Sequence, residues 1–392
     1  MSDFSFSGGS AGAGGLHSGA PDNDADRESV LSGLTEAPSI YSFNSSTDGE
    51  ALLRLIQGRT FNAQNDLYYL PADGTEFARH ICREKAHFAH LVCVGRLYIE
   101  HERVQQILSP VDGQQKRILD LGTGVGNWAI GMAHEFPHAE VIGIDLAPNT
   151  ASTGVLPHNC RFEFDDFNLG LPHYYNSCDV IHCRIIAIGV KDFKWFITEV
   201  AKCLKPGSFF ASLRALSPIT DTRISVGGML FIIEGDHNLL NSRKELQDLA
   251  YGSGDAGQSW LARAMFEAVL TMQKRGSDVD ARMKLYELIS ASAYFENVGE
   301  RNYFVPIGPW EKGGTAEEHQ KGQILGILSR QSMIDLVQSL RPLFISSGYA
   351  KELVDQFVEG TEKELNELTV PMYVKWLYFF GTRNSIPITD EV

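Results

Sequence analysis

Short apolar runs alternate with segments of helical periodicity through the middle of the chain. Five runs have the length and the β-branched or aromatic side chains of buried strands: Arg117–Leu121, Val141–Leu146, Cys160–Phe164, Cys178–His182 and Ser208–Leu213. Helical patterns separate them, and the last, Lys194–Leu204, ends at a Lys-Pro-Gly sequence that stops helices. This alternation predicts an α/β domain with a parallel sheet, whose ligand lies at the carboxyl ends of the strands.

The pattern changes after Leu213. Helical periodicity predicts helices over Gln258–Lys274 and Val279–Ser292. Phe295–Pro306 is predicted as a sixth strand, and Pro371–Thr382, which is rich in Tyr, Trp and Phe, as a seventh. The segment between these two strands, roughly 65 residues long, has mainly helical periodicity.

The N-terminal part of the chain has two different compositions. Residues 1–20 are mostly Gly, Ser and Ala, and an acidic, polar stretch follows. Such a segment buries too little apolar surface to become ordered, so residues 1–45 are predicted to be disordered. Residues 46–110 are predicted to be mainly helical, with one helix beginning at Ala51–Ile56 and a long one covering Glu76–Leu108. This helical region is expected to form a lid over the ligand.

These patterns predict consecutive regions along the chain. They are a disordered tail (1–45), a helical lid (46–110), a ligand-binding α/β core (111–214), a helical cap insertion (215–292), C-terminal strands with intervening helices (293–385) and a short tail (386–392).

A glycine turn carries the strongest chemical signal. The first apolar strand ends at Asp120 and is followed by Gly122, Gly124 and Gly126, after which a helical pattern begins. The next strand also ends in an acid, Asp145. Glycines let the backbone approach a ligand closely, and an acid on the neighbouring strand can accept both hydroxyls of a ribose.

The spacing of the turn selects among nucleotide-like ligands. A pyrophosphate site has G-x-G-x-x-G spacing and backbone donors at a helix N-terminus, whereas this chain has G-x-G-x-G with an acid two residues before it. That acid, Asp120, would repel a pyrophosphate but suits a ligand that carries an amino or sulfonium charge. The pattern therefore resembles motif I of the class I S-adenosylmethionine (SAM) methyltransferases.

Further segments resemble the LaeA-like branch of the fungal class I methyltransferases. They are Leu70-Pro-Ala-Asp73, Ile142-Gly-x-Asp-Leu-x-Pro148, Phe162-Glu-Phe-Asp-Asp166, Asp179-Val-Ile-His-Cys-Arg184, Leu204-Lys-Pro-Gly207, Pro306-Ile-Gly-Pro-Trp310 and the Tyr373–Arg383 segment. The resemblance implies an α/β, Rossmann-like fold with seven strands and helical lid and cap insertions. It also implies a SAM-dependent methyltransferase of secondary metabolism, with S-adenosyl-L-methionine as cofactor and S-adenosyl-L-homocysteine as product.

The same resemblance assigns the cofactor residues. The methionine end of the cofactor would lie against the motif I turn: Asp120, Gly122, Thr123, Gly124 and Gly126. The rest of the cofactor would contact four residues after the second and third strands, with Asp145 at the ribose hydroxyls, Leu146 on the adenine, Asp166 at its amino group and Phe167 at the ring. The neighbouring Asp165 cannot face the same way as Asp166 and is expected to be solvated or capping.

The resemblance also implies that His182 and Arg184, at and after the end of the fourth strand, lie at the floor of the same pocket. His182 is either a buried histidine or a general base for a hydroxyl or carboxyl acceptor. Arg184 either holds the methionine carboxylate or pairs with a structural acid.

Side chains after the core could contribute to an acceptor pocket. Trp260, Met265, Phe266 and Met272 have helical spacing and are predicted as core more readily than as substrate pocket, and Trp310 could cover the pocket.

The chain departs from the LaeA-like pattern at two positions. It has Lys85-Ala86-His87 where a Gln-His pair is usual, and the predicted fifth strand ends Leu213-Arg214 where Leu-x-Glu is usual. The expected acceptor is a small secondary metabolite, with O-methylation favoured. Protein methylation through an acidic groove and a LaeA-type regulator that binds SAM are the alternatives, and a nicotinamide dehydrogenase fits the glycine spacing least well.

The amino-acid composition limits the kinds of binding partner that are expected. The 392 residues include 34 Lys and Arg against 49 Asp and Glu, a formal charge of −15, which argues against nucleic acid as the main partner. The six cysteines have neither disulfide-framework nor metal-ligand spacing, so buried reduced thiols and no metal are expected. No signal-peptide order and no apolar run of ~18 residues occurs, which predicts a cytoplasmic protein with no membrane span.

Overall fold

Seven strands from the two halves of the chain form one mixed sheet in the computed structural model. The structure describes residues 53–56, 59–63, 65–70, 91, 94–147, 156–207, 226–312 and 314–388. Within them the strand order is β5-β4-β3-β6-β7-β9-β8. The strands are β3 (Lys116–Leu121), β4 (Ala139–Asp145), β5 (Cys160–Phe164), β6 (Val180–Arg184), β7 (Met229–Gly235), β8 (Phe295–Pro306) and β9 (Tyr373–Arg383). The predicted seven-stranded, Rossmann-like fold class is confirmed.

Strand direction divides the sheet into two parts. β3 to β7 pair in parallel, and β9 runs antiparallel to both β7 and β8. The predicted sixth strand matches β8, and the seventh matches β9 within two residues. The reversal at β9 lets the last strand lie between two strands that precede it in the sequence.

Two hydrophobic layers cover the sheet. On one face, side chains such as Ile118 and Val180 pack with Val104 of α3 (His101–Leu108) and Trp128 of α4 (Asn127–Glu135). On the other face, α5 (Phe193–Cys203) and α8 (Leu285–Ala291) contribute to the main core. Alternate residues of β3 enter the two layers, because successive strand side chains point to opposite faces.

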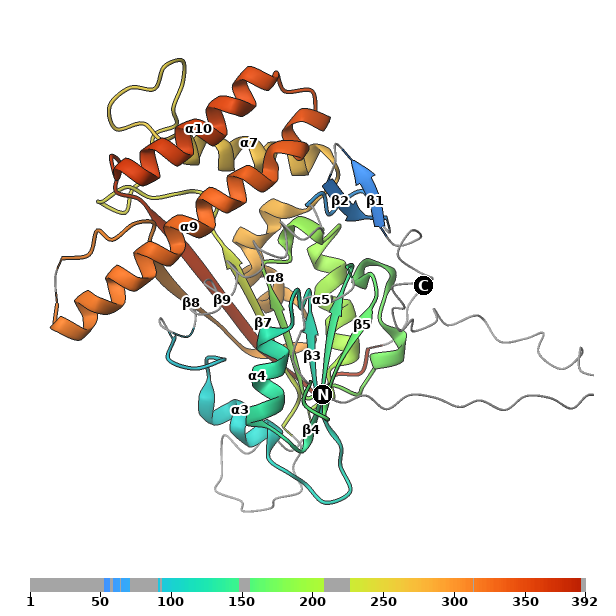
Figure 1. The fold of residues 1–392 in the computed structure, drawn as a ribbon. Coiled ribbons are helices and arrows are strands. Elements are labelled where there is room, and N and C mark those ends of the chain that lie inside the picture. Colours follow the sequence, from blue (N-terminus) through green and yellow to red (C-terminus); the bar gives the residue numbers. More distant parts are fainter. Residues whose placement is uncertain are drawn as a thin grey trace, which may run out of the picture. The chain divides into compact units, whose positions relative to one another are not determined.

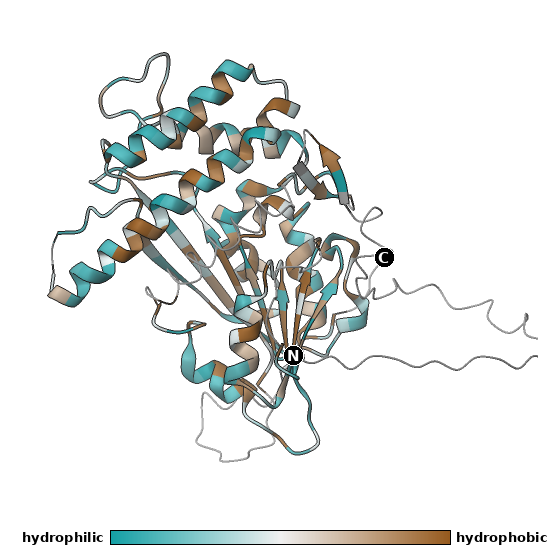
Figure 2. Ribbon diagram, in the orientation of Figure 1, coloured by the Kyte–Doolittle hydropathy of each residue, from teal (hydrophilic) through white to brown (hydrophobic). Residues whose placement is uncertain are grey.

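Three further helices form a cap at the carboxyl ends of the parallel strands. They are α7 (Trp260–Lys274), α9 (Ala316–Ser346) and α10 (Lys351–Glu367), which contact one another and lie above the sheet in Figure 1. In Figure 2, α9 and α10 carry both hydrophobic and hydrophilic residues, as helices with one buried face do.

Buried carboxylate and capping-box contacts hold the ends of the cap helices. The N-terminus of α7 is capped by Ser259, and Glu364 of α10 accepts hydrogen bonds from the N–H groups of Trp260 and Leu261, each at 2.8 Å. Thr315 and Glu318 form a capping box at the start of α9. The cap therefore has an internal polar connection in addition to its apolar contacts.

Short 3₁₀ helices connect several of the larger elements. They are η1 (Phe167–Leu169), η2 (Pro172–Tyr174), η3 (Ala187–Gly189) and η5 (Val279–Lys284). The helix predicted over Val279–Ser292 is thus η5 followed by α8, and the helix predicted from Gln258 is α7.

In the parts of residues 46–110 that the structure describes, α3 falls within the helix predicted over Glu76–Leu108, whereas the helix predicted from Ala51 is wrong. Leu53–Ile56 is strand β1 and pairs in antiparallel fashion with β2 (Arg59–Asn62), so the helix expected from Ala51 is a β-hairpin. Gly95–Glu100 consists of bends, so the C-terminal part of the expected long helix is only α3. Short apolar runs fit either period, and pairing between two strands decided the outcome here.

The sheet continues beyond the predicted core boundary at residue 214. The place beside β6 is taken by Met229–Gly235, and β9 lies on its other side. The predicted strand Ser208–Leu213 lies outside the described residues, as does the predicted tail, residues 1–45. Both Ser208–Leu213 and Met229–Ile233 are apolar runs after a glycine, so local pattern did not distinguish them.

The chain segments on the two sides of residues 208–225 lie next to each other, just before β7. A Cβ atom on Gly207 would lie 3.2 Å from the Gly227 nitrogen, and the Gly228 N–H donates to the Lys205 carbonyl at 2.9 Å. Residues 208–226 thus connect two positions that are already in contact.

Candidate cofactor and acceptor site

The glycine turn joins β3 to α4 in a conformation that favours glycine. Gly122, Gly124 and Gly126 all have left-handed backbones, with φ of 72°, 60° and 83°. A Cβ atom on Gly122 would lie 2.6 Å from Cγ2 of Ile186, so this position has no room for a side chain. The backbone at Gly122 is thus left without a side chain, as a close approach to a ligand at this turn would require.

Asp120 lies in a buried network beneath the turn. Its side chain accepts hydrogen bonds from His182 Nδ1 and from the Thr123 hydroxyl, each at 2.7 Å. Asp120 and His182 are each only 2% exposed. Because a carboxylate only accepts, the histidine Nδ1 carries the proton. The three side chains fix the position of the turn relative to β6.

His182 is enclosed within the core. Its ring stacks on Trp128 with ring centroids 3.8 Å apart, and its Nε2 atom is buried without a hydrogen-bond partner among the described residues. Burial lowers the pKa of His182 below its usual value, although Asp120 opposes the shift. His182 does not line either of the two cavities described below. The buried-histidine alternative therefore fits this geometry better than a general base.

A first cavity lies at the carboxyl ends of β3, β4 and β6. Four of the predicted cofactor residues line it, together with four residues that motif analysis did not identify. The lining consists of Gly122, Asp145, Leu146 and Phe167 and of Tyr68, Ile185, Ile186 and Gly189. We call it the cofactor cavity.

Asp145 shapes the floor of the cofactor cavity. Its Oδ2 atom accepts a hydrogen bond from the Gly124 N–H at 2.7 Å, and Oδ1 accepts one from the Ala147 N–H at 3.1 Å. Each carboxylate oxygen has a second lone-pair direction for another donor. The acid on the second strand thus holds the glycine turn of the first.

Asp166 is engaged by neighbouring amides. It is 6% exposed, its Oδ2 accepts from the Asn65 side chain at 2.8 Å, and its Oδ1 accepts from the backbone and side chain of Asn168. Asn65 in turn accepts from the Tyr68 N–H at 3.1 Å. Asp166 thereby connects the segment after β2 to the cavity edge, although it does not itself line the cavity.

Asp165 and Arg184 lie outside the cavity lining. Asp165 accepts a hydrogen bond from the Asp166 N–H at 2.8 Å, and burial raises its pKa. Arg184 ends β6 two residues after His182, on the same side of the strand, and its charge contributes to lowering the His182 pKa. Neither residue lines the cofactor cavity.

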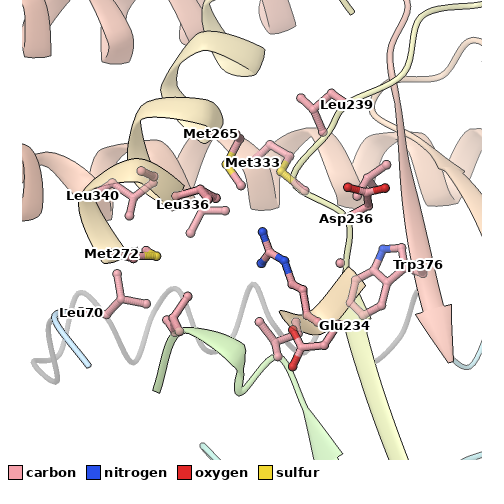
Figure 3. Close-up of a pocket in the computed structure, with 17 residues that line it drawn as sticks. Leu70, Glu234, Asp236, Leu239, Met265, Met272, Met333, Leu336, Leu340 and Trp376 are labelled. Carbon is pink, nitrogen blue, oxygen red and sulfur yellow. The ribbon is translucent and has the colours of Figure 1, made fainter. Parts of the chain in front are cut away.

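A second, mainly apolar cavity adjoins the first. Figure 3 shows methionine and leucine side chains of α7 and α9 around one space, with Glu234 and Asp236 at the end of β7. Its volume is about 130 Å³, and Ile185 lines both this cavity and the cofactor cavity. We call it the acceptor cavity.

The backbone is strained where the two cavities meet. Ile185 has a φ of 55°, and a left-handed backbone is a rare conformation for a β-branched residue. The next two N–H groups, of Ile186 and Ala187, donate to Glu234 Oε1 at 2.8 and 3.0 Å. Glu234 is 1% exposed, so this buried carboxylate holds the strained turn in place.

Sequence reasoning missed Glu234 because it placed the fifth strand at Ser208–Leu213. The signal was present, since Met229–Ile233 is an apolar run that ends in an acid, as the runs before Asp120 and Asp145 do. β7 ends Ile232-Ile233-Glu234, whereas the departure expected at Leu213-Arg214 lies outside the described residues.

The predicted aromatic and methionine candidates divide among the acceptor cavity, the packed helices and the surface. Met265 and Met272 line the acceptor cavity. Trp260 packs against Phe357 of α10, and Phe266 is 40% exposed. The Trp310 indole donates to the Met372 carbonyl at 3.1 Å and does not line the acceptor cavity.

Other expected features concern cysteines, metals and membranes. Four cysteines, Cys160, Cys178, Cys183 and Cys203, are buried free thiols, and burial raises the pKa of Cys160 to about 11. Among the described residues, no cluster of three metal-ligating side chains and no helix long and apolar enough to cross a membrane occurs. The cytoplasmic location stays a prediction.

The amino-acid sequence of this chain is similar to that of several known proteins. Residues 118–207 match a family described as a methyltransferase domain. The chain is similar to methyltransferase str2 of Strobilurus tenacellus, with 36% identity over 279 residues, 71% of this chain and 86% of that protein. It is also similar to the secondary metabolism regulator laeA of Coprinopsis cinerea, with 28% identity over 84% of this chain and 73% of that protein. Methyltransferase pytC of Aspergillus terreus is 25% identical over 69% of this chain and 72% of that protein.

Proposed function

Because this chain belongs to the LaeA-like branch of the class I SAM-dependent methyltransferases, we propose that it transfers a methyl group from SAM to a small secondary metabolite in the acceptor cavity. One observation carries the proposal: the cofactor and acceptor cavities meet at Ile185, at the carboxyl end of β6. Ligands of open α/β sheets bind at these strand ends.

The residues of the cofactor cavity fit SAM. Gly122 has no side chain between its backbone and the cavity, and a Cβ atom there would clash with Ile186, which also lines the cavity. Asp145 offers its remaining lone pairs to the ribose hydroxyls, and Leu146 and Phe167 supply apolar surface for the adenine. The cofactor supplies an activated methyl group on a sulfonium.

Other predicted residues support the site indirectly in this proposal. Asp120, with His182 and Thr123, holds the glycine turn against which the methionine end lies. Asp166 positions the segment that carries Tyr68, a residue of the cavity lining. Arg184 stays a candidate for the methionine carboxylate, at the end of β6.

Catalysis in this proposal comes mainly from placement. Transfer from a sulfonium is an in-line displacement, so holding the acceptor on the axis of the methyl group and excluding water lowers the barrier. Glu234 fixes the turn at Ile186 and Ala187, and the apolar side chains of α7 and α9 exclude water. O-methylation is favoured in this proposal, and an acceptor oxygen that is already ionised would require no base within the cavity.

Two measurements test the proposal. Calorimetric titration with SAM should show binding to the purified protein. Transfer of isotopically labelled methyl in the presence of a fungal metabolite extract should then place the label in molecules of small size. Label only in protein would contradict the small-molecule acceptor, and failure to bind SAM would contradict the whole proposal.

A regulatory role is the second candidate. The similarity to a laeA regulator over 84% of this chain favours it. A regulator of this kind would bind SAM tightly and label no small molecule, so the same two measurements separate it from the biosynthetic enzyme.

A further inference from the structure

Arg282 is a buried cation with two guanidinium nitrogens that have no hydrogen-bond acceptor among the described residues. It belongs to η5, is 7% exposed and lines the acceptor cavity. Its Nε and Nη2 atoms are buried and have no hydrogen-bond partner among the described residues. A guanidinium carries five N–H donors, and leaving buried donors unsatisfied is costly.

The acidic groups around Arg282 already serve other donors. Glu234 Oε1 accepts from the N–H groups of Ile186 and Ala187. Asp236 Oδ1 accepts from the Asn238 N–H at 2.9 Å. These carboxylates compensate the charge of Arg282 but form no hydrogen bond with its Nε and Nη2 atoms.

Arg282 stays charged in this setting. Burial lowers its pKa, whereas the charges of Glu234, Asp236 and Asp280 raise it, and a guanidinium keeps its proton in proteins. The neighbouring His237 is pushed toward its neutral form, because burial and the charge of Arg282 both lower its pKa. Arg282 is thus the permanent cation of the acceptor cavity.

We infer that the methyl acceptor is an apolar monocarboxylate whose carboxylate binds Arg282 while its hydrocarbon body packs against Met265, Met333 and Leu336. This inference rests on the proposed function, because it names the substrate class of the same site. A carboxylate matches the planar fork of a guanidinium with two parallel hydrogen bonds. It would supply acceptors for the Nε and Nη2 atoms that have none within the described part of the chain.

The surroundings favour a singly charged anion. Glu234 and Asp236 already place negative charge beside Arg282, so a dianion such as a phosphate ester would meet more repulsion than a carboxylate. The lining beyond these three residues is mainly apolar and encloses about 130 Å³, which suits a short aliphatic or aryl chain.

The test compares an anion with its neutral analogue of the same length. Decanoate and decan-1-ol are titrated by calorimetry into the full-length protein saturated with S-adenosylhomocysteine. Charge-assisted hydrogen bonds should make decanoate bind about tenfold or more tightly than decan-1-ol. Equal affinities, or no binding of either probe, would overturn the inference and would indicate that water alone solvates Arg282.

Variants at Arg282 test whether this residue causes the preference for decanoate over decan-1-ol. Arg282→Met should remove the preference for decanoate, and Arg282→Lys should keep part of it, because the charge remains while the planar fork is lost. Lys284→Met alters an exposed cation of the same 3₁₀ helix and should leave both affinities unchanged. A preference that survives in Arg282→Met would place the anion elsewhere and overturn the assignment.

The wild-type comparison does not depend on any variant folding. It also separates the two proposals. If S-adenosylhomocysteine binds but the two probes bind equally, only the carboxylate inference fails. If S-adenosylhomocysteine does not bind, while decanoate alone still shows the preference, the methyltransferase proposal fails and the anion site stands.

Discussion

The two cavities that meet at Ile185 are built in different ways. The cofactor cavity is lined mainly by strand ends and turns between Gly122 and Gly189, each close in sequence to a recognisable motif. The acceptor cavity is assembled from side chains scattered from Leu70 to Trp376, mainly on α7, α9, two 3₁₀ helices and the ends of two strands. The first depends on local backbone geometry and the second on how distant helices pack, so substitutions should separate cofactor binding from methyl transfer.

Filling the acceptor cavity should have the largest effect. Ala268 lies on α7, is 2% exposed and lines this cavity. Ala268→Trp should reduce methyl transfer by about 100-fold or more, because misplacing the acceptor removes most of the positioning effect. SAM affinity should stay within a factor of about two, as the cofactor cavity is untouched. Initial rates measure methyl transfer, calorimetry measures SAM affinity, and Ala268→Ser is the control. A parallel loss of SAM affinity would show that substitutions in the acceptor cavity also disturb the cofactor cavity.

Removing the acid at the end of β4 should affect the other cavity. Asp145→Ala should weaken SAM binding about 100-fold, because it removes the acceptor of the ribose hydroxyls and of the Gly124 N–H. Asp145→Asn, which keeps one acceptor oxygen, should lose less, and Asp112→Ala alters an exposed acid with no such contacts. Unchanged SAM affinity in Asp145→Ala would remove the proposed ribose role.

Two glycine-to-alanine variants distinguish the effect of backbone strain from that of a clash with Ile186. Gly122→Ala and Gly113→Ala both place alanine at a left-handed φ, 72° and 75°, which should cost about 1–2 kcal/mol of unfolding free energy in each. Only Gly122→Ala meets Ile186, so it should lose a further ~1–3 kcal/mol and should also weaken SAM binding. Urea unfolding and calorimetry test this. Equal losses in the two variants would contradict the crowding argument.

The buried His182 should make stability depend on pH. Its folded pKa lies below its usual value of 6.5, so the unfolded chain binds a proton that the folded chain resists. The free energy of unfolding should therefore fall as pH drops below about 6.5, by up to ~1.4 kcal/mol per pH unit. Urea unfolding between pH 7 and pH 5 should show a shallower slope for His182→Gln. An unchanged slope would assign the effect to other groups, with His237→Gln as the comparison.

Removing residues 208–226 should have the smallest effect. Their flanks, Gly207 and Gly227, already contact each other. A shorter loop loses less chain entropy when its ends are brought together. The deletion should leave SAM affinity unchanged within a factor of about two and should change the unfolding free energy by at most ~1 kcal/mol. Thermal melting would show the opposite, a large loss of stability, if the predicted strand Ser208–Leu213 contributes to folding.

Much of the fold was predictable where structure depends on residues that are close in sequence. Asp120, the three glycines and Asp145 could be assigned together, because a strand end, a left-handed turn and a helix start occupy consecutive residues. The helix of α7 and the strands β8 and β9 followed from periodicity. The β1–β2 hairpin was missed because its short apolar run fits both periods, and only pairing distinguishes them.

The sequence by itself determined the glycine turn, the acids at the ends of β3 and β4 and the family, because steric limits and side-chain periodicity act over a few neighbouring residues. The tertiary structure decided which apolar run lies beside β6, that Asp120 and Asp166 bind side chains of the protein, and that Glu234 and Arg282 face one cavity. These relationships join residues as much as 100 positions apart, and only the burial and hydrogen bonding of the packed chain select among them.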